Sequence, residues 1–600
     1  MDRSSISRIL IIVAIAALFF QFGLPKLTGG DGPRTQPIVA PGTAAPTPRA
    51  PEALCALEGN RFKAQLSTQG ATLKSWQLAG KKYSADGREG SPPLDLVTTP
   101  DHEKWRPLRT ELWSKAEPAS AEVARQVRYD LFDWKLEPGG DGKACVFTYE
   151  DEQVALRKTV RAGARPFEVE AELSVENRGP GRAAHRAAFE TTAWRTEKEI
   201  EGGFGRQSPF VTQVECSRAG KLTRKLPGDF APKEFSKPEF KHGWLVPEGG
   251  AVDFAAVSNF YFSQALVPLA GPPGAEPVCE LQIEERWNDQ AFGAKKDDPQ
   301  AGSLYRARLA WPRRELGPGE RAEYKLVHFV GPKERDVLAA AGGRGLGDLI
   351  DLGTFAVIAK VLVSFLIFCH RLLGSWGLAI MALTISVRVV LFPLMWKTIQ
   401  SGLKMRMMKP EIDEINRKYA DDPQQKQLAT MELWKKHKVN PVAGCLPTLA
   451  QMPVWFALYT ALQTAAELYH TPFLWFRDLS APDTVRVGSW EVPFLLPLLL
   501  GATTFVQQKI MPQQMDPVQQ KMMSYMMPLV FTAMMLFLPS GLGVYMLTSS
   551  LLGIAQQLAV ERYYDSKTGG KGGGIGVRDK AEAPKEGAVG LALGKGKARV

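Results

Sequence analysis

An apolar run from Trp376 to Trp396 constrains this chain most, because it is long enough to cross a lipid bilayer. A single full charge, Arg388, interrupts the run. An arginine at the middle of a membrane helix costs roughly 2.5–3.5 kcal/mol on insertion scales. Thr384 lies four residues earlier, on the same side of the helix. Two interpretations stay open: the side chain extends to the headgroups near Trp396, or it lies in a polar cavity.

The bulk composition indicates a large membrane protein with several domains, since 600 residues exceed one compact core. The net charge of +11 arises from Lys and Arg clustered beside apolar runs, which is typical of membrane topology and does not indicate a nucleic-acid substrate. The sequence has no metal-binding spacing and no nucleotide motif, so we predict no metal and no cofactor. Six cysteines form no CxxC pair; four lie outside the apolar segments, where their spacing leaves the pairing open.

The first 54 residues predict an anchor followed by a linker. Residues 9–24 are apolar and follow Arg3 and Arg8, and no small-residue cleavage site comes directly after them. We therefore expect an uncleaved membrane anchor over 1–27, with its basic end in the cytoplasm, in preference to a cleaved signal peptide. Residues 28–54 are rich in Pro, Gly, Ala and Thr, which predicts a flexible linker.

Residues 55–332 predict a large all-β domain outside the cytoplasm. The segment from Phe167 to Val175 alternates strictly between apolar and polar residues, and other short β-type runs are separated by turns such as 138–140 and 247–250. Many short strands over this length favour an antiparallel sandwich. The histidines are scattered and no catalytic motif is present, so we predict that the chain is not an enzyme. A sugar-binding site on this domain remains an open alternative.

Residues 346–440 predict an approach to the membrane, a span and a cytoplasmic hairpin. We expect an amphipathic interfacial helix over 346–374 and a transmembrane helix over 375–396. Residues 397–440 carry many Lys and Arg, which places them in the cytoplasm as a hairpin of two helices, 398–419 and 423–438. Its apolar stripes suit contact with client chains through Met407, Ile415 and Trp434; the alternative is a solvated spacer.

Four further transmembrane helices are expected, at 446–466, 492–511, 522–538 and 542–560. An acidic loop at 467–491 lies outside, and a basic, Gly-rich tail at 561–600 lies in the cytoplasm. The predicted fold is thus a multi-span α-helical membrane protein with six transmembrane helices, five of them forming a core, plus the outer β domain. Both termini are cytoplasmic, in a bacterial inner membrane.

Polar residues inside the predicted spans form the candidate site. They come from several helices and contain no acidic partner for the arginine: Arg388, Thr384, Gln451, Gln507, Tyr545 and Ser549. Such a set favours a wetted groove over an arginine that extends to the interface. A proton-coupled transporter typically carries an acidic residue within its spans, which is missing here. A channel or secondary transporter nevertheless remains the rival function.

Six ordered segments of the chain resemble the YidC family of membrane protein insertases, within the Oxa superfamily. They are TISVRVVLFP at 384–393, KMRMMKPEI at 404–412, VNPVAGCLPTLAQM at 439–452, FRDLS at 476–480, DPVQQK at 516–521 and PSGLGVY at 539–545. The anchor and the outer domain resemble the Gram-negative form. In one departure, Met546 follows Tyr545 where some members have a second tyrosine.

The resemblance implies a membrane protein insertase and chaperone, which acts alone or with the Sec translocon. Its groove would be open to the cytoplasm and to lipid, and its outer domain would be a periplasmic β-supersandwich. Arg388 matches the groove arginine of the family, and Thr384, Tyr545 and Ser549 match groove-facing positions. The implied partners are nascent membrane proteins, the Sec translocon, the lipid bilayer and, through the basic hairpin and tail, the ribosome.

Overall fold

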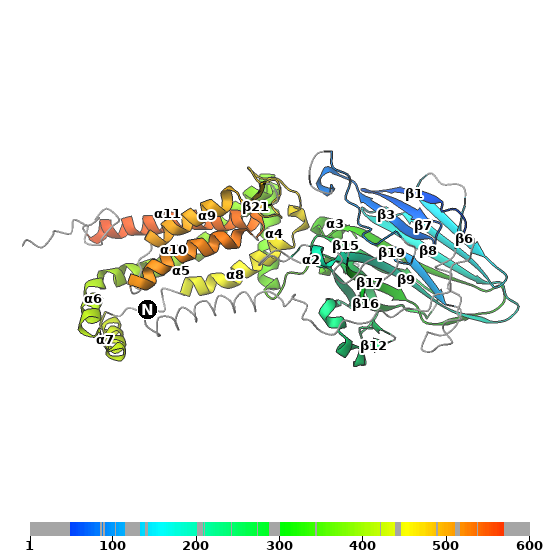
Figure 1. The fold of residues 1–600 in the computed structure, drawn as a ribbon, viewed down its shortest axis with the longest axis horizontal. Coiled ribbons are helices and arrows are strands. Elements are labelled where there is room, and N and C mark those ends of the chain that lie inside the picture. Colours follow the sequence, from blue (N-terminus) through cyan, green and yellow to red (C-terminus); the bar gives the residue numbers. More distant parts are fainter. Residues whose placement is uncertain are drawn as a thin grey trace, which may run out of the picture. The chain divides into compact units, whose positions relative to one another are not determined.

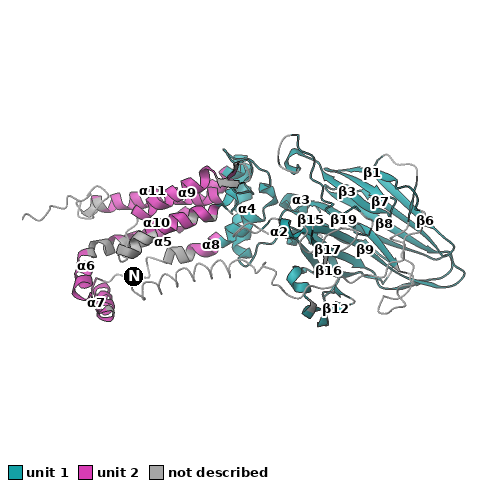
Figure 2. Ribbon diagram, viewed as in Figure 1, with its two compact units in different colours: residues 1–377, 456–483, 536–542 teal, residues 378–455, 484–535, 543–600 magenta. Residues whose placement is uncertain are grey.

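The computed structural model describes seventeen stretches of the chain. They are residues 49–84, 87, 90–101, 104–113, 133–137, 142–200, 208, 210–241, 243–272, 274–286, 301–341, 345–420, 422–437, 446–487, 490–510, 517–536 and 538–568. The predicted anchor, most of the linker and the end of the tail lie outside these residues. The chain divides into two compact units, one of residues 1–377, 456–483 and 536–542 and the other of the remaining helical segments (Figures 1 and 2).

The first unit contains the β domain that the sequence predicted, and every strand pair in its described part is antiparallel. A nine-stranded sheet has the order β11 (Lys221–Lys225), β10 (Gln213–Arg218), β14 (Val252–Ser258), β15 (Phe262–Ala270), β19 (Arg321–Pro332), β8 (Glu168–Asn177), β7 (Val154–Ala162), β6 (Ala144–Glu150) and β5 (Lys135–Leu136). A seven-stranded sheet has the order β12 (Phe240–Lys241), β13 (Trp244–Leu245), β16 (Val278–Arg286), β17 (Gly302–Ala310), β9 (Ala183–Thr196) and β18 (Arg314–Leu316), with β4 (Arg109–Trp113) also paired to β9. Strands β1 (Leu54–Gly59), β2 (Phe62–Ser67) and β3 (Thr72–Leu78) form a third sheet.

The alternation read in the sequence produces strand β8 directly. Phe167, Val169, Ala171, Leu173 and Val175 are all buried in one core cluster, as predicted for a single face. Side chains in a strand alternate between the two faces of its sheet, so five apolar residues at this spacing bury together. The same cluster includes residues from both large sheets, which makes it the core of a sandwich.

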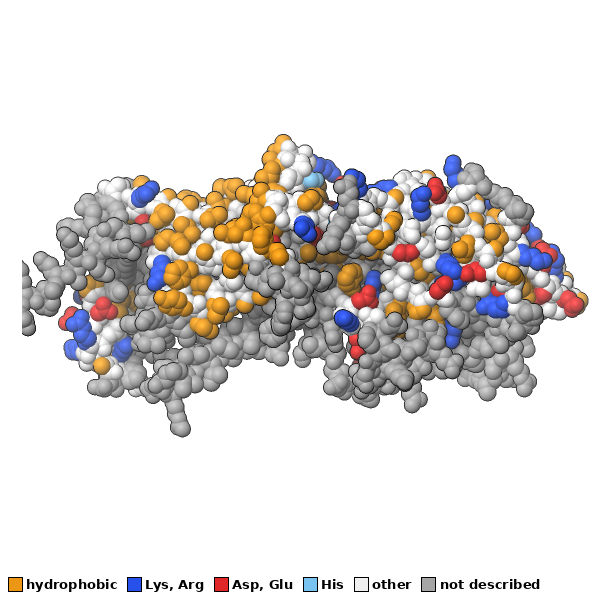
Figure 3. Space-filling view, turned by 45° about the horizontal axis from the view of Figure 1, so that its top comes forward, with side chains coloured by type: hydrophobic (Ala, Val, Ile, Leu, Met, Phe, Trp, Pro, Cys, Tyr) orange, Lys and Arg blue, Asp and Glu red, His pale blue; other side chains and the backbone are white. Residues whose placement is uncertain are grey.

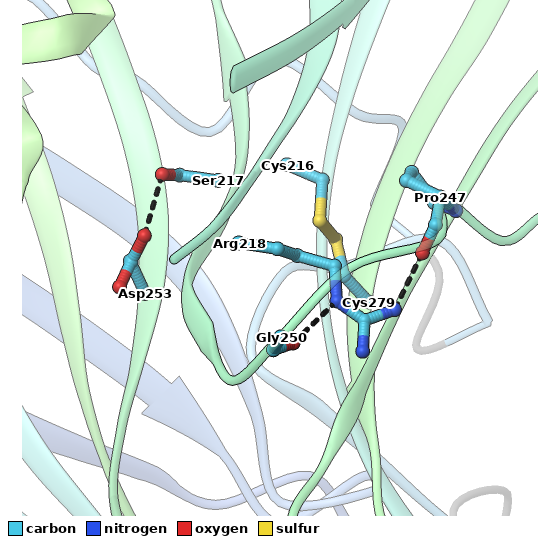
Figure 4. The surroundings of a disulfide bond; sticks show 7 residues. All are labelled: Cys216, Ser217, Arg218, Pro247, Gly250, Asp253 and Cys279. Carbon is cyan, nitrogen blue, oxygen red and sulfur yellow. Dashed lines mark hydrogen bonds between the residues drawn. A yellow bond between two sulfur atoms is a disulfide. The ribbon is translucent and has the colours of Figure 1, made fainter. Parts of the chain in front are cut away.

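Two disulfides connect strands of this domain and settle the pairing that spacing left open. Cys55 of β1 is bonded to Cys145 of β6, and Cys216 of β10 is bonded to Cys279 of β16, which lies in the other large sheet (Figure 4). Next to the second bridge, the Oγ atom of Ser217 donates a hydrogen bond of 2.8 Å to the Asp253 carboxylate. Disulfides persist in oxidising compartments, in agreement with the predicted position outside the cytoplasm.

The neighbouring turn is held by a single arginine. Arg218 donates hydrogen bonds from Nε to the Gly250 carbonyl and from Nη1 to the Pro247 carbonyl (Figure 4). These bonds tie the turn at 247–250, which the sequence predicted, to strand β10. Gly249 in this turn has φ = +152°, a backbone conformation that favours glycine.

The helical part of the chain begins after the β domain. A short helix α3 (Arg335–Ala340) and a 3₁₀ turn η6 (Leu346–Leu349) lead to the longer helices. These are α4 (Ala356–Leu373), α5 (Trp376–Met407), α6 (Lys409–Lys418), α7 (Pro423–Lys436), α8 (Leu446–Gln463), α9 (Leu495–Ile510), α10 (Pro517–Met535) and α11 (Ser540–Thr568). A hairpin of β20 (Thr484–Val487) and β21 (Trp490–Pro493) precedes α9.

Three of the described helices are long and apolar enough to cross a membrane: Ala356–Leu373, Trp376–Trp396 and Ser540–Tyr564. Apolar side chains cover much of the visible surface of the helices (Figure 3). Val357, Val389 and Val390 are each at least 65% exposed, which is unfavourable in water and expected against lipid. The interfacial placement of 346–374 stays a prediction.

Helix boundaries are where the structure departs from the sequence prediction. Helix α5 does not end at Trp396 but continues to Met407, and the next helix, α6, begins only at Lys409. The predicted boundary followed a change from apolar to basic residues. That change marks where the helix surface becomes polar, whereas Lys, Gln, Leu and Met still favour the helical backbone. Helix α11 also extends past Val560, to Thr568, and the added residues begin with Glu561 and Arg562, which favour the helical backbone.

The loop after α8 belongs to the first unit and packs against the β domain. Tyr469 joins the core cluster of that domain, with its ring centroid 5.2 Å from those of Tyr261 and Phe262. The Glu467 carboxylate accepts hydrogen bonds of 2.9 Å from the backbone N–H and from Nη1 of Arg335. The loop is therefore held by both an aromatic contact and an ion pair.

Candidate functional site

The charge in the middle of α5 is bound by a hydroxyl on another helix. Arg388 donates hydrogen bonds to the Ser549 Oγ atom from Nε at 3.0 Å and from Nη2 at 2.7 Å. A longer contact of 3.4 Å joins its Nη1 to Oε1 of Gln556. Ser549 and Gln556 are seven residues apart on α11 and therefore share one face. Since Arg388 is only 8% exposed, its guanidinium lies between helices instead of extending past Trp396.

A glycine on α11 leaves the space that the guanidinium occupies. A Cβ atom added at Gly553 would lie 3.4 Å from both Nη1 and Nη2 of Arg388. The same Cβ would lie 3.3 Å from Nε2 of Gln507, so this α9 side chain reaches the same place. The three helices α5, α9 and α11 thus meet around one cation, as the sequence predicted for Arg388, Gln507 and Ser549.

A second pair of the predicted residues lies one turn along α11. Tyr545 is 2% exposed, and its hydroxyl is 3.5 Å from Nε2 of Gln451 on α8. Tyr545 and Ser549 are four residues apart on the same face of their helix. The predicted set therefore includes side chains from four helices.

Thr384 is the predicted residue whose polar group is already used by its own helix. Its hydroxyl donates a 2.7 Å hydrogen bond to the Ile380 carbonyl, and the side chain is fully buried. This is the common behaviour of Thr in a membrane helix. Gln556 and Gly553 are the residues that sequence reasoning missed. Their spacing of seven and four residues from Ser549 is the signal that points to them.

No carboxylate forms an ion pair with Arg388 in the part of the chain that the structure describes. The acidic residue of α11 that comes first after Ser549 is Glu561, and it accepts a 2.9 Å hydrogen bond from Gln557. It lies twelve residues beyond Ser549, about 18 Å along the helix axis. Among the described residues, the positive charge of Arg388 is thus stabilised by neutral dipoles, and it remains able to attract an anionic group.

The hairpin presents fewer apolar side chains than its sequence predicted. Trp434 packs against Met408 and Ile412 within the hairpin, and Ile415 is half-buried. The side chain of Met407 lies outside the described residues. The exposed apolar side chains of α7 are Leu428 and Met431, at 53% and 42%. These two could meet a partner without any rearrangement of the hairpin.

The β domain shows buried charges that pair with one another. Although burial opposes ionisation of Glu190, Arg109 and Arg306 hold the pKa of its carboxyl below the ordinary value. Arg109 Nη2 is 2.7 Å from this carboxylate, and Arg306 Nε is 2.5 Å from it. An ionised, fully paired carboxylate is a poor proton donor, so Glu190 is not suited to act as a general acid. The described residues contain no group of three His, Cys, Asp or Glu that could hold a metal.

Comparison with known proteins covers nearly all of these elements. Residues 55–365 match the family model described as the YidC periplasmic domain, and residues 368–567 match the model described as 60Kd inner membrane protein. The membrane protein insertase YidC of Anaeromyxobacter sp. (strain K) is 34% identical over 516 residues, which is 85% of each chain. The chain belongs to the YidC family of membrane protein insertases.

A second relative and a solved structure are also YidC insertases. The YidC insertase of Pelobacter propionicus is 44% identical over 255 residues, 42% of this chain and 47% of that protein. A crystal structure of an active YidC insertase, with its first transmembrane domain resolved, covers 84% of this chain at 16% identity and a TM-score of 0.34. The family assignment confirms the resemblance seen in the sequence, and it places the chain among insertases and not among enzymes.

Proposed function

We propose that this chain inserts apolar helices of client proteins into the bacterial inner membrane through a groove centred on Arg388. The observation that carries the proposal is a buried guanidinium bound by Ser549 and Gln556 with no carboxylate partner among the described residues. Such a charge attracts the acidic or polar end of a client and brings it partway into the membrane. Tyr545, Gln451 and Gln507 complete a polar surface along which that end can move.

Burial of the client's own side chains would drive the second step. Each CH₂ group that leaves water gains about 0.8 kcal/mol, so an apolar helix that moves sideways into lipid needs no nucleotide. The exposed side chains of Val389 and Val390 on α5 offer an apolar path next to the charge. The arginine would therefore lower the barrier for the polar end while lipid captures the apolar segment.

The topology and the partners are part of the same proposal. Six spans with both termini in the cytoplasm would place the disulfide-bonded β domain in the periplasm and the α6–α7 hairpin in the cytoplasm. Basic residues of the hairpin and tail would suit contact with the ribosome, and Leu428 and Met431 would touch the emerging client. Cooperation with the Sec translocon is proposed for clients with large outer domains.

Thiol accessibility tests the groove. Single cysteines at Gln507 and Ser549 would be introduced after replacing Cys369 and Cys445, with both disulfides of the β domain kept. A small charged thiol reagent added from the cytoplasmic side should label both positions, and the same reagent added from the periplasmic side should label them poorly. A cysteine at the exposed position Val390 serves as the control, because lipid should shield it from the charged reagent.

The labelling pattern separates this function from its rivals. Equal labelling from both sides indicates a continuous polar path and therefore a channel or transporter. Labelling from neither side means that Arg388 is closed off by packing, and the groove proposal fails. Replacing Arg388 by Lys should retain more insertion of a single-span client than replacing it by Gln, because the proposal requires the charge.

A further inference from the structure

A cavity lies within the first unit. It has a volume of about 740 Å³ and is bounded by strand β11, helix α3, turn η6 and one face of α4. Ligand sites commonly have volumes of about 300–1,000 Å³, so a small molecule or a lipid headgroup fits it. None of its residues belongs to the site described above.

Two exposed side chains of opposite charge, Lys360 and Asp348, line this cavity, and the other charged groups around it are buried or paired. The Lys360 ammonium has no hydrogen-bond or ion-pair partner among the described residues, and it projects from the cavity face of α4. Arg335 uses Nη1 for Glu467, whereas its Nη2 is buried without a partner in the described part of the chain. The Asp348 side chain, on η6, is exposed and lines the same cavity. Arg224 is already paired with Glu215 at 2.7 Å.

Helix α4 joins the cavity to an exposed apolar surface. Its cavity face consists of Ala356, Lys360, Val363, Ser364 and Ile367, which recur at helical spacing. The next face round the helix carries large exposed apolar side chains, from 37% to 80% exposed: Val357, Val361, Phe365, Phe368 and Leu372. The helix is long and apolar enough to lie in a membrane. A ligand in the cavity would therefore have an apolar surface beside its polar end.

We propose that this cavity binds the headgroup of a zwitterionic aminophospholipid. Lys360 donates to the phosphate, the Asp348 carboxylate accepts from the ammonium group, and the acyl chains lie along the apolar face of α4. Charge complementarity selects this class, because a purely anionic headgroup would meet the Asp348 carboxylate, whereas Asp351 is already 3.6 Å from Nη1 of Arg224. Charge-assisted hydrogen bonds of this kind are the strong ones in proteins.

Native mass spectrometry of the full purified chain tests the site. The chain would be titrated in detergent with phosphatidylethanolamine, with phosphatidylglycerol and with inorganic phosphate. The wild-type chain should retain one phosphatidylethanolamine molecule and should bind it more tightly than phosphatidylglycerol.

Lys360→Gln should weaken the binding of both lipids about tenfold, as expected for the loss of one charge-assisted hydrogen bond. Asp348→Asn should weaken only phosphatidylethanolamine. Arg371→Gln is the matched control, since this exposed cation lies on α4 outside the cavity.

Several outcomes would overturn the proposal. Unchanged lipid binding in folded Lys360→Gln, with the unfolding midpoint of the wild-type chain, removes the phosphate contact. Equal affinity for the two lipids removes the role of Asp348. Competition by inorganic phosphate as strong as that by lipid would make the ligand a soluble phosphate compound and not a lipid.

Discussion

At the scale of single residues, Gly553 is the position that most directly controls the guanidinium of Arg388. A methyl group there would lie against Nη1 and Nη2 at 3.4 Å, in van der Waals contact, and would approach Nε2 of Gln507 to 3.3 Å, so that the Gln507 side chain has to shift by a few tenths of an ångström. The substitution also removes a glycine from a helix interior, which by itself stabilises a helix by up to about 1 kcal/mol. Stability and activity are thus expected to change in opposite directions.

Gly553→Ala should therefore keep or raise the unfolding temperature and lower the rate of client insertion severalfold. The rate would be measured in proteoliposomes with a single-span client. Ala555→Leu adds bulk two residues away on an exposed part of α11 and should leave the rate unchanged. A normal insertion rate in Gly553→Ala would show that the position of the guanidinium is not critical.

Buried histidines predict how the β domain responds to acid. Burial lowers the pKa of His185 to about 4, with a further contribution from Arg314. The unfolded chain has the ordinary value near 6.5, so it binds more protons than the folded one between about pH 4 and 6.5. Stability from this residue is complete above pH 6.5 and is lost as the pH falls toward 4.

His185→Gln should flatten this dependence while keeping a polar partner for the Tyr324 hydroxyl, which is 2.7 Å from the His185 Nε2 atom. The measurement is the unfolding midpoint of the full chain by calorimetry across pH 4–7. Converted to a free energy of unfolding, the pH-dependent difference between wild type and His185→Gln should amount to at most about 3 kcal/mol. The half-exposed His437 of the hairpin, changed to Gln, is the control. Parallel curves for wild type and His185→Gln would contradict the expectation.

The residues of the site show what the sequence can and cannot reveal. Arg388, Ser549 and Gln507 were predictable because each is a polar residue within an apolar stretch, and such residues are costly unless they meet one another. The role of Gly553 was not predictable. A glycine has no side chain, and its role here is to leave room for side chains of other helices, which the sequence does not show. Thr384 was expected to face a groove, but the backbone of its own helix satisfies its hydroxyl.

At the scale of elements, local patterns were reliable and long-range contacts were not. Strand β8 followed from alternation alone, because burial on one face of a strand repeats every second residue. The pairing of Cys216 with Cys279 could not follow from sequence, since it depends on how two sheets stack. The packing of the loop after α8 on the β domain was also hidden, because Tyr469 and Phe262 are two hundred residues apart in the chain.

This loop contact leads to a prediction for Tyr469→Ala. Truncating a buried aromatic side chain costs roughly 3 kcal/mol, so the loop should open more easily. Hydrogen exchange of residues 466–483 in the full chain would report the opening. Leu474→Ala, at a position 72% exposed in the same loop, should exchange like the wild type. If Tyr469→Ala also exchanges normally, the ion pair between Glu467 and Arg335 is sufficient to hold the loop.

At the scale of the whole molecule, the two units divide the proposed work. The contacts of Arg388 with Ser549 and Gln556 all lie in the second unit. The β domain contributes no side chain to them. The β domain does hold the loop after α8. Nζ of Lys82, in the β domain, donates a 3.1 Å hydrogen bond to the carbonyl of Glu467, in the loop. We therefore expect the β domain to be separable from insertion, but not without effect on this loop.

Two deletions that keep the anchor would separate these roles. Removing 60–310 takes away Lys82, Tyr261 and Phe262 but leaves Arg335, which still pairs with Glu467 at 2.9 Å. Client insertion in cells should stay near the wild-type level, while the purified chain unfolds at a lower temperature.

Removing 60–340 also takes away Arg335, and it leaves Glu467 without its ion pair beside the membrane helices. This longer deletion should insert clients markedly less well, and Glu467→Gln in the shorter deletion should reproduce part of that loss. Abolished insertion by a normally expressed 60–310 deletion would instead mean that the β domain takes part directly in the transfer of the client.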